Sequence, residues 1–209
     1  APALVYMSQP TEYCTLYARQ ELEELSAGGR KRDLKLFVDG ARLAYALASP
    51  ANDVTLADLA RLTDVFYIGG TKCGSLFGEA VVIPERGSIR QFVTQMKQHG
   101  ALLAKGRLLG VQFEALFEDG LYLTIGEPAV KATARIREAL KRAGYVVTMD
   151  SPTNLTFVAL DQAGHERLSD KVRYSIWETL PDGRYLARIG TSWATPEEDV
   201  AAFEQALAR

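Results

Sequence analysis

The chain has 209 residues, of which 47% are hydrophobic, and its formal net charge at pH 7 is −2. This length suits one large domain or two small ones and allows a sizeable hydrophobic core. The slight negative charge argues against a nucleic acid or a membrane surface as partner, because either would need a clustered basic face. Two cysteines, Cys14 and Cys73, are too few for a disulfide framework, so we expect free thiols in a cytoplasmic protein. No apolar run reaches about 18 residues, so we expect no transmembrane helix.

The first 83 residues alternate strand-like and helix-like segments. Apolar runs that predict strands lie at 3–7, 34–38, 65–68 and 79–83. Helical periodicity covers 16–30 and 55–62, and Thr55 with Asp58 forms a weak capping box for the second of these helices. Strands separated by helices predict right-handed crossovers and a mainly parallel sheet, in which ligands lie beyond the carboxyl ends of the strands.

The second half of the chain has a different pattern. A long helical stretch over 88–117 is broken by Gly100 and Gly106, which is typical of a connector between domains. The elements expected after it are a helix at 128–143 that Gly144 ends, strands at 154–160, 172–177 and 184–190, and a last helix that begins at Thr195-Pro196-Glu197. We therefore expect an α/β fold with a small α+β domain at its C-terminal end.

The stretch FYIGGTKCG (66–74) is the most informative for function. It runs from an apolar strand into two glycines, a threonine, Lys72 and, two residues later, another glycine. Glycines on both sides let the backbone turn tightly and let a flat ligand approach closely. A lysine at a strand end can form a Schiff base with an aldehyde, and desolvation lowers its pKa toward that of a usable nucleophile. The alternative is a loop lysine that points to water, and spacing alone does not separate the two.

A second strand end carries FVDGAR (37–42). In sites for pyridoxal phosphate (PLP), a carboxylate pairs with the pyridine nitrogen and keeps it protonated, so Asp39 is a candidate for this role. Arg42 could reach a substrate carboxylate with a bidentate fork. The alternative for Asp39 is the cap of the next helix. Asp39 and Lys72 each lie at a strand end and are separated by one helix and one strand. Together they indicate a ligand site more strongly than either residue alone.

Four sequence blocks carry a resemblance to a known family: VDGARL, FYIGGTKCGSLFGEAVVI, KGRLLG and RIGTSWATPEEDV. They resemble, in the same order, blocks of the threonine aldolase / β-eliminating lyase family, and the resemblance covers essentially the whole chain. It implies PLP as cofactor and the aspartate aminotransferase-like fold of type I. Residues 1–87 would be the C-terminal part of the PLP-binding large domain, 88–118 a connector helix region, and 119–209 the small α+β domain.

The resemblance also assigns roles to five residues. Lys72 would bond covalently to PLP, and Asp39 would pair with the pyridinium nitrogen. Arg42 and Arg188 would bind the substrate carboxylate, and Arg107 would lie near the cofactor phosphate. The implied reaction cleaves the Cα–Cβ bond of a β-hydroxy-α-amino acid, for example threonine to glycine and acetaldehyde, in a homodimer or homotetramer. The alternatives are another PLP-dependent reaction (β-elimination or transamination) and an inactive fragment.

The chain departs from the family pattern in two ways. Cys14 stands in TEYCT where the family usually has a glycine, which would crowd a turn. The N-terminal half of the family, with its phosphate-binding loop and a histidine that stacks on the pyridine ring, has no counterpart here. His99 and His165 are poor substitutes, because a lone histidine is usually a surface or packing residue, so the general base stays unidentified. No Cys/His spacing predicts a metal site.

Overall fold

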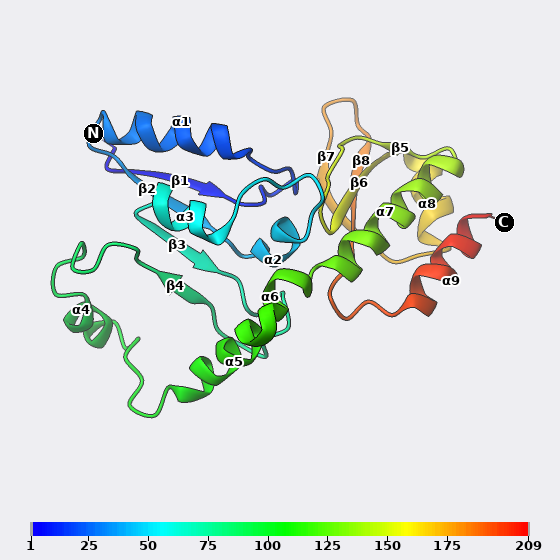
Figure 1. The fold of residues 1–209 in the computed structure, drawn as a ribbon. Helices are drawn as coiled ribbons and strands as arrows, with labels where there is room; N and C mark the ends of the chain where they lie inside the picture. Colours follow the sequence, from blue (N-terminus) through cyan, green and yellow to red (C-terminus); the bar gives the residue numbers. More distant parts are fainter. Residues whose placement is uncertain (1, 209) are drawn as a thin grey trace.

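The computed structural model describes residues 2–208 and contains two four-stranded sheets joined by helices (Figure 1). The strands are β1 (Leu4–Ser8), β2 (Lys35–Asp39), β3 (Val65–Ile68), β4 (Ala80–Val82), β5 (Val146–Val147), β6 (Leu155–Leu160), β7 (Ser175–Thr179) and β8 (Tyr185–Gly190). The helices are α1 (Arg19–Arg30), α2 (Leu43–Leu47), α3 (Leu56–Leu62), α4 (Phe92–Gln98), α5 (Arg107–Phe117), α6 (Leu121–Thr124), α7 (Glu127–Arg142), α8 (Gln162–Ser169) and α9 (Glu197–Ala208). Over residues 2–208, every helix falls short of the length and apolar character needed to cross a membrane.

The first sheet has the strand order β1-β2-β3-β4. β1 pairs with β2 and β2 with β3 in parallel, whereas β4 runs antiparallel to β3, so the prediction of a mainly parallel sheet is confirmed. Because successive side chains alternate between faces, Val38 and Phe66 point into a core against α1 and α3. The opposite face is open: Tyr6 is 58% exposed and Val81 59%.

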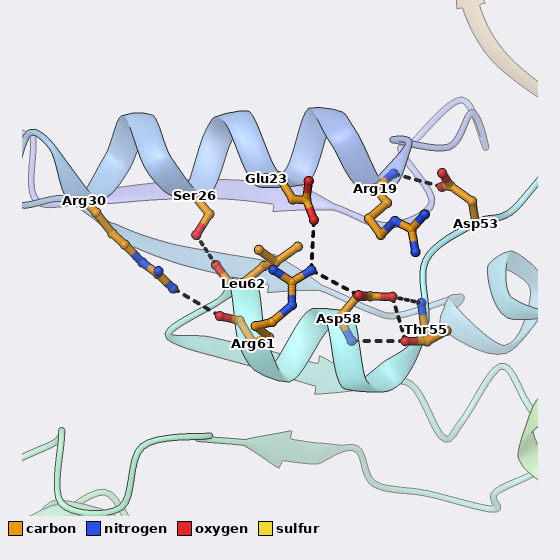
Figure 2. A network of polar contacts seen from close by, with 9 residues as sticks. All are labelled: Arg19, Glu23, Ser26, Arg30, Asp53, Thr55, Asp58, Arg61 and Leu62. Atoms are coloured by element: carbon orange, nitrogen blue, oxygen red, sulfur yellow. Dashed lines mark hydrogen bonds and ion pairs between the residues drawn. The ribbon is translucent and has the colours of Figure 1, made fainter.

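Helices α1 and α3 lie side by side over the covered face, and polar contacts fix their separation (Figure 2). The Ser26 hydroxyl donates to the Leu62 carbonyl oxygen at 2.7 Å, and the Arg61 guanidinium reaches the Glu23 carboxylate at 2.9 Å. The predicted capping box is present, since the Thr55 hydroxyl accepts from the Asp58 N–H and the Asp58 carboxylate accepts from the Thr55 N–H. These contacts hold α1 and α3 together on the sheet.

The second sheet is antiparallel, with the order β5-β6-β8-β7. All six residues of β6 are buried, because both faces of this sheet are covered. On one face Val158 and Leu160 pack with residues of α7, α8 and α9. On the other face Leu155 and Phe157 pack with Cys14, which belongs to the segment between β1 and α1. The N-terminal segment therefore contacts both sheets.

Several predicted elements differ from the structure. The helix expected at 16–30 begins at Arg19, because the Glu21 carboxylate accepts a hydrogen bond from the Ala18 N–H. The 88–117 pattern forms α4 and α5, with the expected break between them. The strand expected at 172–177 was wrong in position: β7 starts at Ser175, and Val172 packs against the helix-covered core outside the sheet. Four short elements, α2, α6, α8 and β5, were not predicted.

Candidate functional site

The two glycine-rich segments that follow β2 and β3 pack directly against each other. The Gly69 N–H donates to the Gly40 carbonyl oxygen at 2.9 Å. A Cβ atom at Gly40 would lie 1.9 Å from the Tyr67 carbonyl oxygen, and one at Gly69 would lie 2.4 Å from the Ala41 carbonyl oxygen. Both distances are too short for any side chain, so glycine is required at both positions. This contact holds the segments that carry Asp39 and Lys72 together.

The backbone around Lys72 is fixed by two side chains. Glu79 accepts hydrogen bonds from the Gly70 N–H and from the Thr71 hydroxyl, the latter at 2.7 Å. The Tyr45 hydroxyl donates to the Lys72 carbonyl oxygen. Burial raises the pKa of Tyr45 to about 12, so the phenol stays protonated and remains a donor. The Lys72 residue itself is exposed, so its amine is accessible while its backbone is held.

Asp39, at the end of β2, is half-buried and accepts three hydrogen bonds. They come from the Tyr6 hydroxyl, the Tyr67 hydroxyl and the Ala41 N–H, the last at 2.9 Å. Burial alone would raise the pKa of this carboxyl, but these hydrogen bonds and the charge of Lys72 outweigh it and lower the pKa below its usual value. Asp39 is therefore ionised at neutral pH, and Lys72 is near enough to contribute to that.

Lys72, Arg42 and Arg188 line one pocket of about 450 Å³ between the two sheets. No aspartate or glutamate is among its lining residues. Within residues 2–208, none of the ion pairs involves any of these three cations. The pocket is therefore electropositive, with donors that are not already used by carboxylates, and it suits a small anionic ligand.

Arg188 reaches this pocket from the middle of an antiparallel strand. It lies on β8, and its guanidinium carbon sits 4.5 Å from the centre of the Trp177 ring, a cation–π contact that orients the side chain. Burial raises the pKa of the Cys14 thiol, whereas the charges of Arg42 and Arg188 oppose that rise. The charges of Arg42 and Arg188 therefore both act on the buried thiol, although Cys14 is not among the residues that line the pocket.

Cys14 is buried and has a φ of 59°, in the left-handed region that favours glycine. The sequence departure noted at this position thus coincides with a backbone conformation that crowds a β-carbon. The turn is held by the Cys14 carbonyl oxygen, which accepts from the Ser151 hydroxyl at 3.1 Å and the Thr153 hydroxyl at 3.3 Å. These bonds tie the N-terminal segment to the second sheet.

Other predicted residues lie elsewhere. Arg107 is exposed in the first turn of α5, and neither Arg107 nor Asp39 is among the residues that line this pocket. His99 caps the end of α4, and the Nδ1 atom of His165 lies 2.7 Å from the Tyr174 hydroxyl, in the C-terminal unit. Residues 2–208 hold no group of three or more His, Cys, Asp or Glu side chains arranged for a metal ion.

Sequence reasoning missed several residues at the site. Tyr6 and Tyr67 contact Asp39 directly, and Glu79 binds Gly70 and Thr71, which precede Lys72. Trp193, interpreted as a packing residue, is 44% exposed and lines the pocket. Strand alternation is a signal for Tyr67, because it places this side chain on the face opposite the buried Phe66. For Tyr6 and Glu79, pairing across strands and loops has to be known first.

The two sheets and their connection are those of PLP-dependent enzymes with the aspartate aminotransferase-like fold. Aminotransferases with 15–16% identity match 97–99% of the chain with TM-scores of 0.68–0.71, which at this identity shows the fold alone. The chain belongs to the β-eliminating lyase family, whose sequence profile matches residues 1–163. The predictions of fold and family are thereby confirmed.

Individual relatives agree with this assignment. Two low-specificity L-threonine aldolases, from Pseudomonas aeruginosa and Pseudomonas sp. (strain NCIMB 10558), are 29% and 36% identical over 204 residues. This is 95% of the chain but 57% of each relative. A solved structure of Leishmania major threonine aldolase matches 100% of the chain and 61% of its own, with 44% identity and a TM-score of 0.93. The chain thus spans somewhat more than half the length of these proteins.

Proposed function

We propose that this chain is the C-terminal part of a PLP-dependent aldolase that cleaves the Cα–Cβ bond of β-hydroxy-α-amino acids, with threonine giving glycine and acetaldehyde. The observation that carries the proposal is the convergence of Lys72, Arg42 and Arg188, from three separate segments, on one pocket free of acidic residues. The residues present fit the group: the exposed Lys72 amine, the ionised carboxylate of Asp39, which lies outside the pocket lining, and two guanidiniums are the donors and acceptors that PLP and an amino acid require.

Each residue has a distinct task in this proposal. Lys72 would hold the cofactor through its amine, and the Asp39 carboxylate would keep the ring nitrogen protonated. Arg42 and Arg188 bind the substrate carboxylate and set the orientation of the bond to be broken. PLP, when bound, supplies the electron sink for that bond. We keep Arg107 as the candidate for the cofactor phosphate on the family resemblance alone, because it does not line the pocket of Lys72.

The proposal extends to organisation and assembly. We place the large-domain part at 1–87, the connector at 88–118 and the small domain at 119–209. The core of the first sheet and the core between the second sheet and α7, α8 and α9 support two units, although Tyr122 and Ala129 belong to the core of the first sheet. We further propose a cytoplasmic homodimer or homotetramer. Large apolar side chains exposed near the connector support an interface, among them Leu76 at 87% and Leu108 at 65% exposure.

A direct test uses the protein expressed from its complete reading frame and titrated with PLP. We expect an absorbance band in the visible-violet region that Lys72→Ala abolishes, together with acetaldehyde release from threonine. Lys141→Ala is the matched control, because this exposed lysine on α7 forms a surface pair with Glu138, and it should leave both signals unchanged. A colourless wild-type protein that does not respond to PLP would contradict the proposal and favour an inactive remnant.

The same residues could support β-elimination or transamination, so the products distinguish the reactions. Glycine with acetaldehyde from threonine, or with formaldehyde from serine, indicates aldol cleavage. Ammonia with 2-oxobutyrate from threonine, or with pyruvate from serine, indicates elimination. Transamination is recognised by amino transfer to an added keto acid. If ammonia or pyruvate is the main product, PLP and Lys72 keep their proposed roles, but the reaction is not the proposed Cα–Cβ cleavage.

A further inference from the structure

The two oxygens of the Asp39 carboxylate have different environments. Oδ1 accepts from the Tyr67 hydroxyl and from the Ala41 N–H, whereas Oδ2 accepts from the Tyr6 hydroxyl. A carboxylate oxygen has about two acceptor positions. Oδ1 is therefore saturated, and Oδ2 keeps one position for a further donor. The asymmetry selects which oxygen can bind a ligand.

The two tyrosines are placed by the sheet and braced by a third ring. Tyr6 lies on β1 and Tyr67 on β3, on either side of the strand that carries Asp39. The Phe37 ring stacks on Tyr6 at 5.4 Å with an angle of 9° between planes, and lies 6.2 Å from Tyr67. All four side chains share the open face of the sheet, so the hydroxyls converge on Asp39 from a packed aromatic row.

We propose that Tyr67 and Tyr6 are positioning residues that lock the Asp39 carboxylate with Oδ2 presented to the nitrogen of the PLP ring. Tyr67, with the Ala41 N–H, fills Oδ1, and Tyr6 keeps the carboxylate from rotating. This inference rests on the proposed function, because it takes PLP as the ligand of Asp39.

The protonation of these groups supports the arrangement. The hydrogen bond to Asp39, with burial and the Asp39 charge, raises the pKa of Tyr6 to about 12. Burial first, and then Asp39, raise the pKa of Tyr67 as well. Both phenols therefore remain donors over the whole neutral range, and Asp39 remains an ionised acceptor. A ring nitrogen at Oδ2 would meet a negative charge in a fixed orientation.

The test uses the protein from its complete reading frame, loaded with PLP carrying ¹⁵N in the ring. Tyr67→Phe removes one hydroxyl and keeps the ring, so PLP affinity should fall severalfold, because the carboxylate must then be ordered when the ring nitrogen binds. The ring-nitrogen resonance should move toward that of neutral pyridine, because a looser and more basic carboxylate draws the proton away from nitrogen. Tyr6→Phe, at a more exposed site, should weaken binding by about threefold and move the resonance in the same direction.

Tyr185→Phe is the matched control, since this hydroxyl donates to Gln162 in the C-terminal unit at 3.2 Å. It should change neither the affinity nor the resonance. If wild type binds PLP but both Tyr67→Phe and Tyr6→Phe leave the ring-nitrogen resonance where it was, the tyrosines only connect strands, and the inference is wrong while the proposed function stands. If wild type does not bind PLP, the proposed function itself fails. Tyr6→Phe keeps the inference testable if Tyr67→Phe does not fold.

Discussion

The two sheets of this protein differ in how they are covered and in how they deliver functional side chains. The first sheet has one face against α1 and α3 and one open face, and its candidate residues lie at or beyond the ends of parallel strands. The second sheet is packed on both faces, and its contribution, Arg188, comes from within a strand. The first sheet thus supplies its candidate residues from loops that close backbone contacts hold in place, and the second supplies one from within a strand.

Because of this difference, substitutions in the second sheet should act mainly on stability, and substitutions in the first sheet mainly on the geometry of the site. In the second sheet a side chain matters mainly through the packing of β6, whose residues are all buried. In the first sheet the glycine contacts between the segments after β2 and β3 decide where Asp39 and Lys72 lie. Substitutions in the two regions should therefore lower different measured quantities.

The largest expected effect on stability is in the second sheet. Phe157 is fully buried between Cys14, Leu155 and Leu186, so Phe157→Ala should lower the free energy of unfolding by about 3–5 kcal/mol. Denaturant unfolding monitored by circular dichroism measures this. A loss below about 1 kcal/mol would mean that this face of the sheet is loosely packed, and the contrast between the sheets would weaken.

Gly69→Ala should have a smaller effect on stability and a large one on the site. Its β-carbon would meet the Ala41 carbonyl oxygen at 2.4 Å, so the segments after β2 and β3 must separate, at about 1–3 kcal/mol. We expect PLP binding to be lost or strongly weakened in an absorbance titration. Gly110→Ala is the matched control: this glycine in α5 has open space around its β-carbon position, and the change should stabilise by about 0.5–1 kcal/mol. If Gly69→Ala and Gly110→Ala had the same effects on stability and on PLP binding, the close contact between the segments after β2 and β3 would not be what positions the site.

The smallest effect concerns the turn that joins the two regions. Because Cys14 has a φ of 59°, Cys14→Gly should be more stable than Cys14→Ala by about 1 kcal/mol. At an ordinary position the order is reversed, since glycine increases the entropy of the unfolded chain. Comparing these two variants by thermal unfolding removes the contribution of the buried thiol. A more stable alanine variant would show that the turn is not strained.

How far the sequence predicts this structure also differs between the regions. For the first sheet, apolar runs and helical periodicity predicted the strands, the capping box at Thr55 and the parallel order, because each depends on local pattern. The position of β7 could not be predicted in this way, since Val172 is apolar through packing outside the sheet. Short helices such as α2 lack enough turns to show a period.

For the site, residue pattern alone indicated Asp39 and Lys72 but left solvent and capping alternatives open, and Arg188 entered only through the family resemblance. Neither approach found Tyr6 or Tyr67, because their contacts with Asp39 depend on strand register, which a single sequence does not specify. The pocket also brings Arg42 and Arg188 together across more than 140 residues of chain, a contact that no local pattern encodes.

The central claim is that Lys72 is the residue that bonds to PLP, and chemical trapping tests it most directly. The protein, incubated with PLP, is reduced with borohydride, digested and mapped by mass spectrometry, so that a transient bond becomes permanent. We expect the pyridoxyl group on the peptide that contains Lys72 and on no other. A label on a different lysine, or spread over exposed lysines such as Lys141 without enrichment at Lys72, would contradict the account.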